Sequence, residues 1–147
     1  MIYLGADHRG YKLKEYISEY LDDRAIEFED MGANNEELSD YPIYARKVGN
    51  KIAGTENRGI LICGSGAGMT IASNKIKGVY AALATNPKMA SAIKQQDDVN
   101  VLVLAADFTS EEQTKNILDA WLDTEYDRQG RHQKRIDQIK ELEKKSD

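Results

Sequence analysis

Five short apolar runs alternate with longer stretches of helical periodicity, and this alternation constrains the fold more than any other feature of the sequence. The runs are apolar on both faces of a strand, as a buried parallel sheet requires. Strands are expected at Ile2–Ala6, Ile26–Met31, Gly59–Cys63, Val79–Ala84 and Val99–Ala105. Helices are expected at Tyr11–Leu21, Tyr41–Ala53, Gly68–Ile76, Pro87 to about Gln95 and Glu111–Leu122, with a last helix from near Arg131 into the charged tail KELEKKSD.

Strands that alternate with helices predict a parallel sheet with helices on both faces. The expected fold is a flavodoxin-like three-layer αβα sandwich, with a five-stranded parallel sheet in the order 2-1-3-4-5 and an extra C-terminal helix. The 147 residues fit one domain, and the sequence contains no internal repeat, linker or shift in composition.

The composition excludes several classes of protein. With 41% hydrophobic and 31% charged residues, the chain is typical of a soluble globular protein. Its net charge of −5 argues against a nucleic-acid surface, although a few local cations could still hold a small anionic substrate. No apolar stretch is long enough to span a membrane, and the N-terminus MIYLGADHRG lacks the layout of a signal peptide. A single cysteine permits no intrachain disulfide, so we expect a cytoplasmic protein.

Two polar clusters follow strands that should be neighbours. The first strand ends at Asp7 and His8, and the third ends at Cys63, followed by a glycine-rich turn. In the expected strand order, the first and third strands meet at the topological switch point, where open α/β sheets bind ligands beyond the carboxyl ends of the strands. We therefore expect the two clusters to converge on one crevice.

The segment CGSGAG places the only cysteine between a strand and a helix. Glycines allow the backbone to turn so that successive N–H groups can face one oxyanion, and the start of a helix adds partial positive charge. This setting suits a nucleophile or a general base. The same pattern also fits a packed cysteine beside a tight turn. The segment is neither a dinucleotide-binding fingerprint nor a P-loop.

Two further polar segments, Asp7–His8 and GRHQKR (130–135), can also be explained by structural roles alone. Asp7 and His8 could form a helix cap and a solvated imidazole. In GRHQKR, Arg131 and Arg135 lie four residues apart and share one helix face, which suits a phosphate-binding site. Taken alone, however, the segment is better explained as a solvated basic turn, because such turns are common.

Taken together, the strings GADHRGYKLK, DYP (40–42), RGILICGSGAGM, IASNKIKGVYAAL and GRHQKRIDQI resemble the ribose-5-phosphate isomerase B family, which also contains galactose-6-phosphate isomerase subunits. The resemblance covers nearly the whole chain, and the cysteine–glycine loop followed by IASNK is its most specific part. It implies a flavodoxin-like fold, a metal-free and cofactor-free aldose–ketose isomerase of phosphosugars, and residues 1–147 as a single sugar-phosphate isomerase domain. The most direct reading is interconversion of ribose 5-phosphate and ribulose 5-phosphate through a cis-enediolate.

The resemblance also implies roles for individual residues. Cys63 is the base that moves the proton between C2 and C1, and Ser65 assists it. Asp7 and His8 bind sugar hydroxyls or phosphate, and Tyr41 lines the crevice. The backbone N–H groups that hold the enediolate oxygens belong to Gly64, Ser65, Gly66, Ala67 and Gly68. Arg131 and Arg135 bind the phosphate. The family's site lies between two subunits, so a homodimer is implied.

Three positions depart from the family pattern. Where many members read RxHNDAN, residues 94–100 read KQQDDVN, so Gln96 replaces the ring-opening histidine and Asp97 replaces the asparagine that contacts the intermediate. Glutamine cannot serve as a general acid at neutral pH. Where many members carry a phosphate-binding arginine after the fifth strand, this chain has Asp107, and a carboxylate there would repel a phosphate.

These departures leave several functions open. The chain is a ribose-5-phosphate isomerase that opens the ring with another group or water, an isomerase of a tetrose or hexose phosphate, or one subunit of a hetero-oligomer. A phosphosugar-binding regulatory module without catalysis is an alternative from another class. The retention of Cys63 and Ser65 together with both arginines favours an isomerase.

Overall fold

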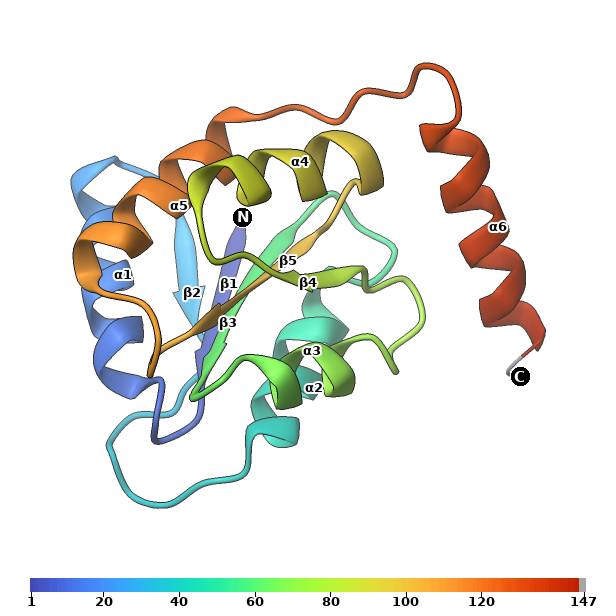
Figure 1. Ribbon diagram of the computed structural model, residues 1–147. Coiled ribbons are helices and arrows are strands. Elements are labelled where there is room, and N and C mark those ends of the chain that lie inside the picture. The colour runs from blue at the N-terminus through green and yellow to red at the C-terminus, as the bar shows by residue number, and fades with distance from the viewer. Residues whose placement is uncertain (146–147) are drawn as a thin grey trace.

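The computed structural model describes residues 1–145 and has the three layers that the sequence predicts (Figure 1). The strands are β1 (Ile2–Ala6), β2 (Phe28–Asp30), β3 (Arg58–Cys63), β4 (Ala81–Leu83) and β5 (Val101–Ala105). The helices are α1 (Tyr11–Asp23), α2 (Tyr41–Ile52), α3 (Ala67–Ser73), α4 (Pro87–Asp97), α5 (Glu111–Asp123) and α6 (His132–Lys145). No helix among residues 1–145 combines the length and apolar character that a membrane crossing needs.

The sheet is entirely parallel, and its strand order is β2-β1-β3-β5-β4. The fold class is therefore as predicted, but the expected order 2-1-3-4-5 is wrong for the last two strands. The reason is burial. All five residues of β5 are buried, whereas β4 has only three residues and two of them are partly exposed. A central strand is shielded on every side, whereas edge strands are typically short and partly exposed, so the burial of β5 fits its place inside the sheet and the short β4 forms the edge.

Each face of the sheet is covered by the apolar side of a set of helices. On one face α1, α4 and α5 enclose a core that includes Ile17, Ala90 and Trp121. On the other face α2 and α3 enclose a second core that includes Val48 and Met69. The helices thereby fix the position of both ends of the sheet.

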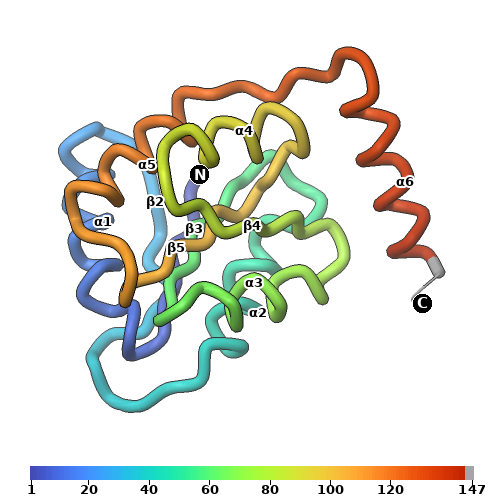
Figure 2. Tube along the Cα trace, in the orientation of Figure 1, coloured from blue at the N-terminus to red at the C-terminus, as the bar shows by residue number. Residues whose placement is uncertain are grey.

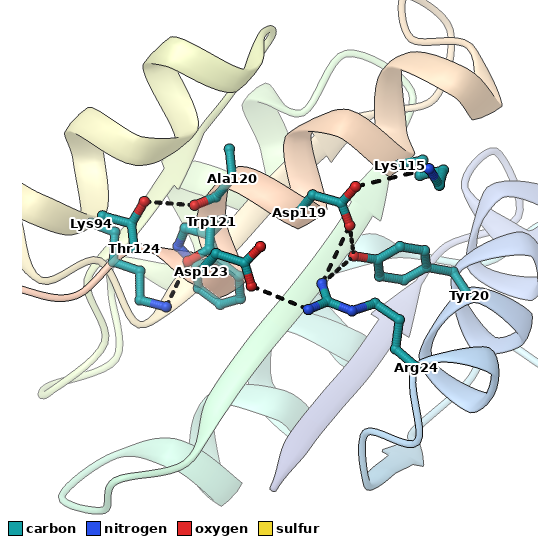
Figure 3. Close-up of polar contacts among 9 residues, drawn as sticks. All are labelled: Tyr20, Arg24, Lys94, Lys115, Asp119, Ala120, Trp121, Asp123 and Thr124. Atoms are coloured by element: carbon teal, nitrogen blue, oxygen red, sulfur yellow. Dashed lines mark hydrogen bonds and ion pairs between the residues drawn. The ribbon is translucent and has the colours of Figure 1, made fainter.

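A polar network joins α1 to α5 on the first face (Figure 3). Tyr20 donates its hydroxyl hydrogen to Asp119, and Arg24 donates to the Tyr20 oxygen at 2.7 Å and to Asp123 at 3.1 Å. Burial, followed by the hydrogen bond to Asp119, raises the pKa of Tyr20 to about 12. The network holds the two helices in register across their exposed rims.

Lys94 is buried against the end of α5 and is only 1% exposed. Its Nζ donates to the carbonyl oxygen of Trp121 at 2.6 Å and lies 4.8 Å from the centroid of the indole ring (Figure 3). The ammonium group thus satisfies a carbonyl in the last turn of a helix, where positive charge is favoured. This contact attaches the C-terminal half of α4 to α5.

Helix α6 stands apart from the three layers and is connected by a long extended segment (Figures 1 and 2). It packs on α4 and borders an apolar groove of about 460 Å³. The groove is lined by side chains of α6, such as Ile139, and by residues next to the edge strand, such as Tyr80. The predicted C-terminal helix is present, and the last two residues of the tail KELEKKSD lie outside the described residues.

Candidate active site

The carboxyl ends of β1, β3 and β5 lie side by side, because β3 pairs with β1 on one side and with β5 on the other. Ala6 pairs with Ile62, and Cys63 pairs with Ala105. The segments that follow the three strands are therefore adjacent. The prediction that Asp7–His8 and the cysteine–glycine loop converge is confirmed, and the chain between β5 and α5 joins them.

Cys63 is the last residue of β3, and its free thiol is buried with 4% exposure. The loop turns at Gly66, whose φ of +80° is in the left-handed region, and a Cβ there would lie 2.7 Å from a methyl group of Leu83. Ser65 is exposed, and its Oγ accepts a hydrogen bond from the N–H of Ala67 at 3.3 Å. The glycine is required for this turn, and the turn presents Ser65 at the surface beside the buried thiol.

Tyr41 begins α2 and lies against the same loop. An ideal Cβ at Gly68 would come within 2.4 Å of Cζ of Tyr41. The phenol ring therefore covers Gly68, and it can do so only because position 68 has no side chain. The structure thus places Tyr41 beside the predicted site, although its role there remains a prediction.

Asp7 organises the segment that follows β1. Its side chain is buried, and Oδ1 accepts hydrogen bonds from the backbone N–H groups of Arg9 at 3.0 Å and Gly10 at 3.1 Å. A Cβ at Gly10 would lie 2.6 Å from the carbonyl oxygen of Ile62, so this segment packs directly on β3. Asp7 thus fixes the turn before α1, next to Cys63. The alternative reading of Asp7 as the helix cap is wrong, because the N-cap of α1 is Gly10 and no side chain caps it.

His8 is half-buried and faces Ser39 in the chain before α2. Its backbone N–H donates to the Ser39 hydroxyl at 3.0 Å. Its ring Nδ1 lies 3.2 Å from the carbonyl oxygen and 3.3 Å from the backbone nitrogen of Ser39. The imidazole is therefore oriented through Nδ1, and Nε2 is the ring nitrogen that remains for a ligand.

Arg9 is a site residue that the sequence analysis missed. Its Nη2 donates to Oδ2 of Asp107, across the carboxyl ends of β1, β3 and β5. An ideal Cβ at Gly64 would lie 2.7 Å from both Cζ and Nε of Arg9 and 2.9 Å from Oδ2 of Asp107, so the ion pair lies over Gly64. The carboxylate of Asp107, which is expected to repel a phosphate, is paired with Arg9, which offsets that charge.

The remaining predicted site residues lie at the opposite end of the sheet. Gln96 and Asp97 are exposed in the last turn of α4, which ends beside the start of β5. The N–H of Asp127 donates to the carbonyl oxygen of Gln95 at 3.0 Å and ties the segment before α6 to this end of the molecule. Arg131 directly precedes α6 and Arg135 lies in its first turn, and α6 packs on α4.

The predicted site is thus divided into two groups within one chain. The Cys63 group is at the carboxyl ends of the strands and contains Asp7, His8, Tyr41, Cys63 and the loop Gly64–Gly68. The arginine group is at the amino ends and contains Gln96, Asp97, Arg131 and Arg135. Strand β3 has six residues and spans about 20 Å, so one chain does not bring the two groups together.

Comparison with known proteins gives a consistent result. A family model described as ribose/galactose isomerase matches residues 2–139. A ribose-5-phosphate isomerase B of Escherichia coli (strain K12) is 41% identical, over 98% of this chain and 97% of that protein. A structure of ribose-5-phosphate isomerase B from Clostridium thermocellum has a TM-score of 0.94 and 39% identity, and covers 99% of both chains. A structure of ribose-5-phosphate isomerase B from Mycoplasma genitalium, with bound ribulose 5-phosphate, has a TM-score of 0.92 and 40% identity over 97% of this chain and 95% of that chain.

Proposed function

Because the chain belongs to the ribose/galactose isomerase family, we propose that it interconverts ribose 5-phosphate and ribulose 5-phosphate. The observation that carries the proposal is the Cys63 group: a buried free thiol, a glycine turn and the Asp7–His8 segment at the carboxyl ends of β1 and β3. The Mycoplasma genitalium relative, which holds ribulose 5-phosphate, supports the choice of substrate.

Cys63 is the proposed base. As a thiolate it removes the proton from C2 of the open-chain aldose, and the electron pair of that C–H bond forms the enediolate. The same proton returns to C1, while a hydroxyl proton moves from O2 to O1, which gives the ketose. Ser65 assists the transfer between oxygens, since its exposed hydroxyl both donates and accepts.

The glycine loop supplies the proposed cradle for negative charge. Amide N–H groups of Gly64–Gly68 hold the enediolate oxygens, and fixed donors at a site of developing charge are the largest contribution to many such reactions. Asp7 and His8 bind sugar hydroxyls, with Nε2 of His8 directed to the ligand. Tyr41 closes the side of the loop.

A second copy of the chain completes the proposed site. The arginine group lies at the wrong end of its own sheet, so Arg131 and Arg135 would reach the substrate phosphate from the partner. Exposed apolar side chains near the Cys63 group support a partner surface there, since large exposed apolar groups mark interaction sites. Leu38 is 86% exposed and Phe108 is 75% exposed. A cytoplasmic homodimer is the proposed state.

Gln96 favours a second substrate class. The opening of a furanose ring needs a proton donor, and neither glutamine nor an exposed aspartate is a good donor at pH 7. A four-carbon aldose 4-phosphate cannot form a five-membered ring, because its 4-oxygen is esterified. Such an acyclic phosphosugar is the alternative substrate.

The proposed function is tested with the purified protein and tetrose, pentose and hexose phosphates. We expect aldose–ketose conversion of ribose 5-phosphate or ribulose 5-phosphate, and loss of C2-proton exchange with deuterium oxide in Cys63→Ala. Cys63→Ser is the matched variant, and it should also be inactive because a hydroxyl is far less acidic than a thiol. Absence of turnover with every phosphosugar, or wild-type exchange in Cys63→Ala, would contradict the proposal.

A further inference from the structure

The Arg9 guanidinium lies over the residue that follows the proposed base. A Cβ at Gly64 would overlap Cζ and Nε of Arg9 at 2.7 Å, a separation that a glycine alone permits. The side chain of Arg9 is 57% exposed, so a ligand at the Cys63 group can reach it. Arg9 is thus a cation beside Cys63 that comes from the same chain.

The backbone that carries Arg9 is firmly held. Oδ1 of Asp7 accepts the N–H of Arg9 at 3.0 Å, and Gly10 packs on the carbonyl oxygen of Ile62. The side chain therefore starts from a fixed point next to β3. A cation whose attachment point is fixed loses less conformational freedom when it binds an anion.

Asp107 holds the other end of the side chain. Its own backbone N–H donates to the carbonyl oxygen of Gly64 at 3.0 Å, so both members of the ion pair are anchored beside Gly64. An ion pair as exposed as this one contributes little to folding stability. The ion pair is better explained as a device that orients the Arg9 guanidinium. Asp107 contacts only Nη2, and a guanidinium has further N–H donors on Nε and Nη1 that can bind a ligand.

We propose that Arg9 binds the substrate phosphate, and that Asp107 is the positioning residue that directs the guanidinium. This inference rests on the proposed function and adds a phosphate contact from the chain that supplies Cys63. The planar fork of arginine matches phosphate oxygens, which a sugar hydroxyl would not require. The phosphate is then held from both sides, by Arg9 of one chain and by the arginine group of its partner.

The first test measures the binding of inorganic phosphate by titration calorimetry, and KM and kcat with ribulose 5-phosphate. In Arg9→Gln we expect phosphate affinity to fall about 10- to 100-fold, as for the loss of a charge-assisted hydrogen bond, with a matching rise in KM. Arg9→Lys should be intermediate, because it keeps the charge and loses the fork. Lys12→Gln is the matched control, since Lys12 is an exposed cation on α1 that pairs with Glu36, and it should behave like the wild type.

The second test exchanges the charges. Arg9→Asp alone should abolish phosphate binding, and Arg9→Asp combined with Asp107→Arg should restore it to within about tenfold of the wild type, because either position then places a guanidinium over Gly64. Thermal unfolding identifies variants that have folded.

Phosphate affinity at the wild-type level in Arg9→Gln, or a folded double variant without recovery, would overturn the assignment. Calorimetry measures phosphate binding without turnover, so it tests the role of Arg9 separately from the proposed isomerase activity. A wild-type protein that binds phosphate through Arg9 but isomerises no phosphosugar would contradict only the proposed function.

Discussion

Two inactive variants of this chain should restore each other's activity when they share an oligomer. Cys63→Ala removes the proposed base at the carboxyl ends of the strands. The double variant Arg131→Ala/Arg135→Ala removes the cations at the amino ends. The two groups are separated by the length of β3, about 20 Å, so the proposed site takes the first from one copy and the second from the other.

The expected magnitude follows from this division. In a mixed dimer, one site carries both defects and the other carries none. Random assortment makes about half of the dimers mixed, so about a quarter of the wild-type sites should be intact. Each arginine contributes a charge-assisted contact of about 1.5–3 kcal/mol, so the homodimers of the arginine variant add little to this activity at low substrate.

The assay unfolds and refolds the two variants together and follows the isomerisation of ribulose 5-phosphate. Mixed oligomers isolated through two different affinity tags should reach about half of the wild-type activity per chain. A mixture of Cys63→Ala with Cys63→Ser is the control, and it should remain inactive because both variants lack the same group. Inactive mixed oligomers in the first experiment would refute the division of the site between copies.

Four further outcomes are expected. Gln96→His should raise kcat/KM for ribose 5-phosphate more than for ribulose 5-phosphate, since only the former needs ring opening; an equal change would contradict this role. Gly68→Ala should raise KM with little loss of stability, because its Cβ would come within 2.4 Å of Tyr41 and displace the ring; unchanged kinetics would argue against a role for that ring. The pKa of Tyr20 is raised from 10.0 to about 12, so its protonated hydroxyl stabilises the fold below pH 10, and this contribution is lost as the pH rises to about 12. In Tyr20→Phe, the free energy of unfolding measured in urea should therefore fall less steeply between about pH 10 and 12 than in the wild type. An unchanged slope would be inconsistent with that shift. Ala25→Gly should stabilise the protein by about 1 kcal/mol in the same assay, because Ala25 follows the C-cap of α1 at a φ of +55°; a loss of stability would be inconsistent with strain there.

The three layers of the fold could be predicted because the apolar runs indicate buried strands and the stretches between them have helical periodicity. The order of the last two strands could not be predicted from the alternation alone, because any right-handed crossover connects parallel strands. The residues do not separate the two strands, since β4 and β5 are both apolar. They differ in length and burial: β5 has five residues, all buried, while the edge strand β4 has three, two of them partly exposed.

The error in strand order explains why Arg9 was missed. In the order 2-1-3-4-5, the fifth strand would lie at the edge, and Asp107 would be far from the first strand. In the observed order, β1 and β5 flank β3, and the opposite charges that follow them meet over Gly64. The placement of Cys63 beside Asp7 did not depend on this point, because β1 and β3 are neighbours in both orders.

The two groups of site residues differ in how firmly one chain can hold them. The Cys63 group is fixed by contacts within the chain: Asp7 accepts two backbone hydrogen bonds, and Gly10 packs on Ile62. Arg131 and Arg135 lie at the start of α6, which packs on α4 and accepts a hydrogen bond from the N–H of Gly78 through Glu143. Under the proposed function, the proton transfer has a frame that is fixed within one chain, and the phosphate contacts of Arg131 and Arg135 depend on assembly. Arg9 differs from Arg131 and Arg135 in the proposed site, because contacts within its own chain hold it near Cys63 before any partner binds.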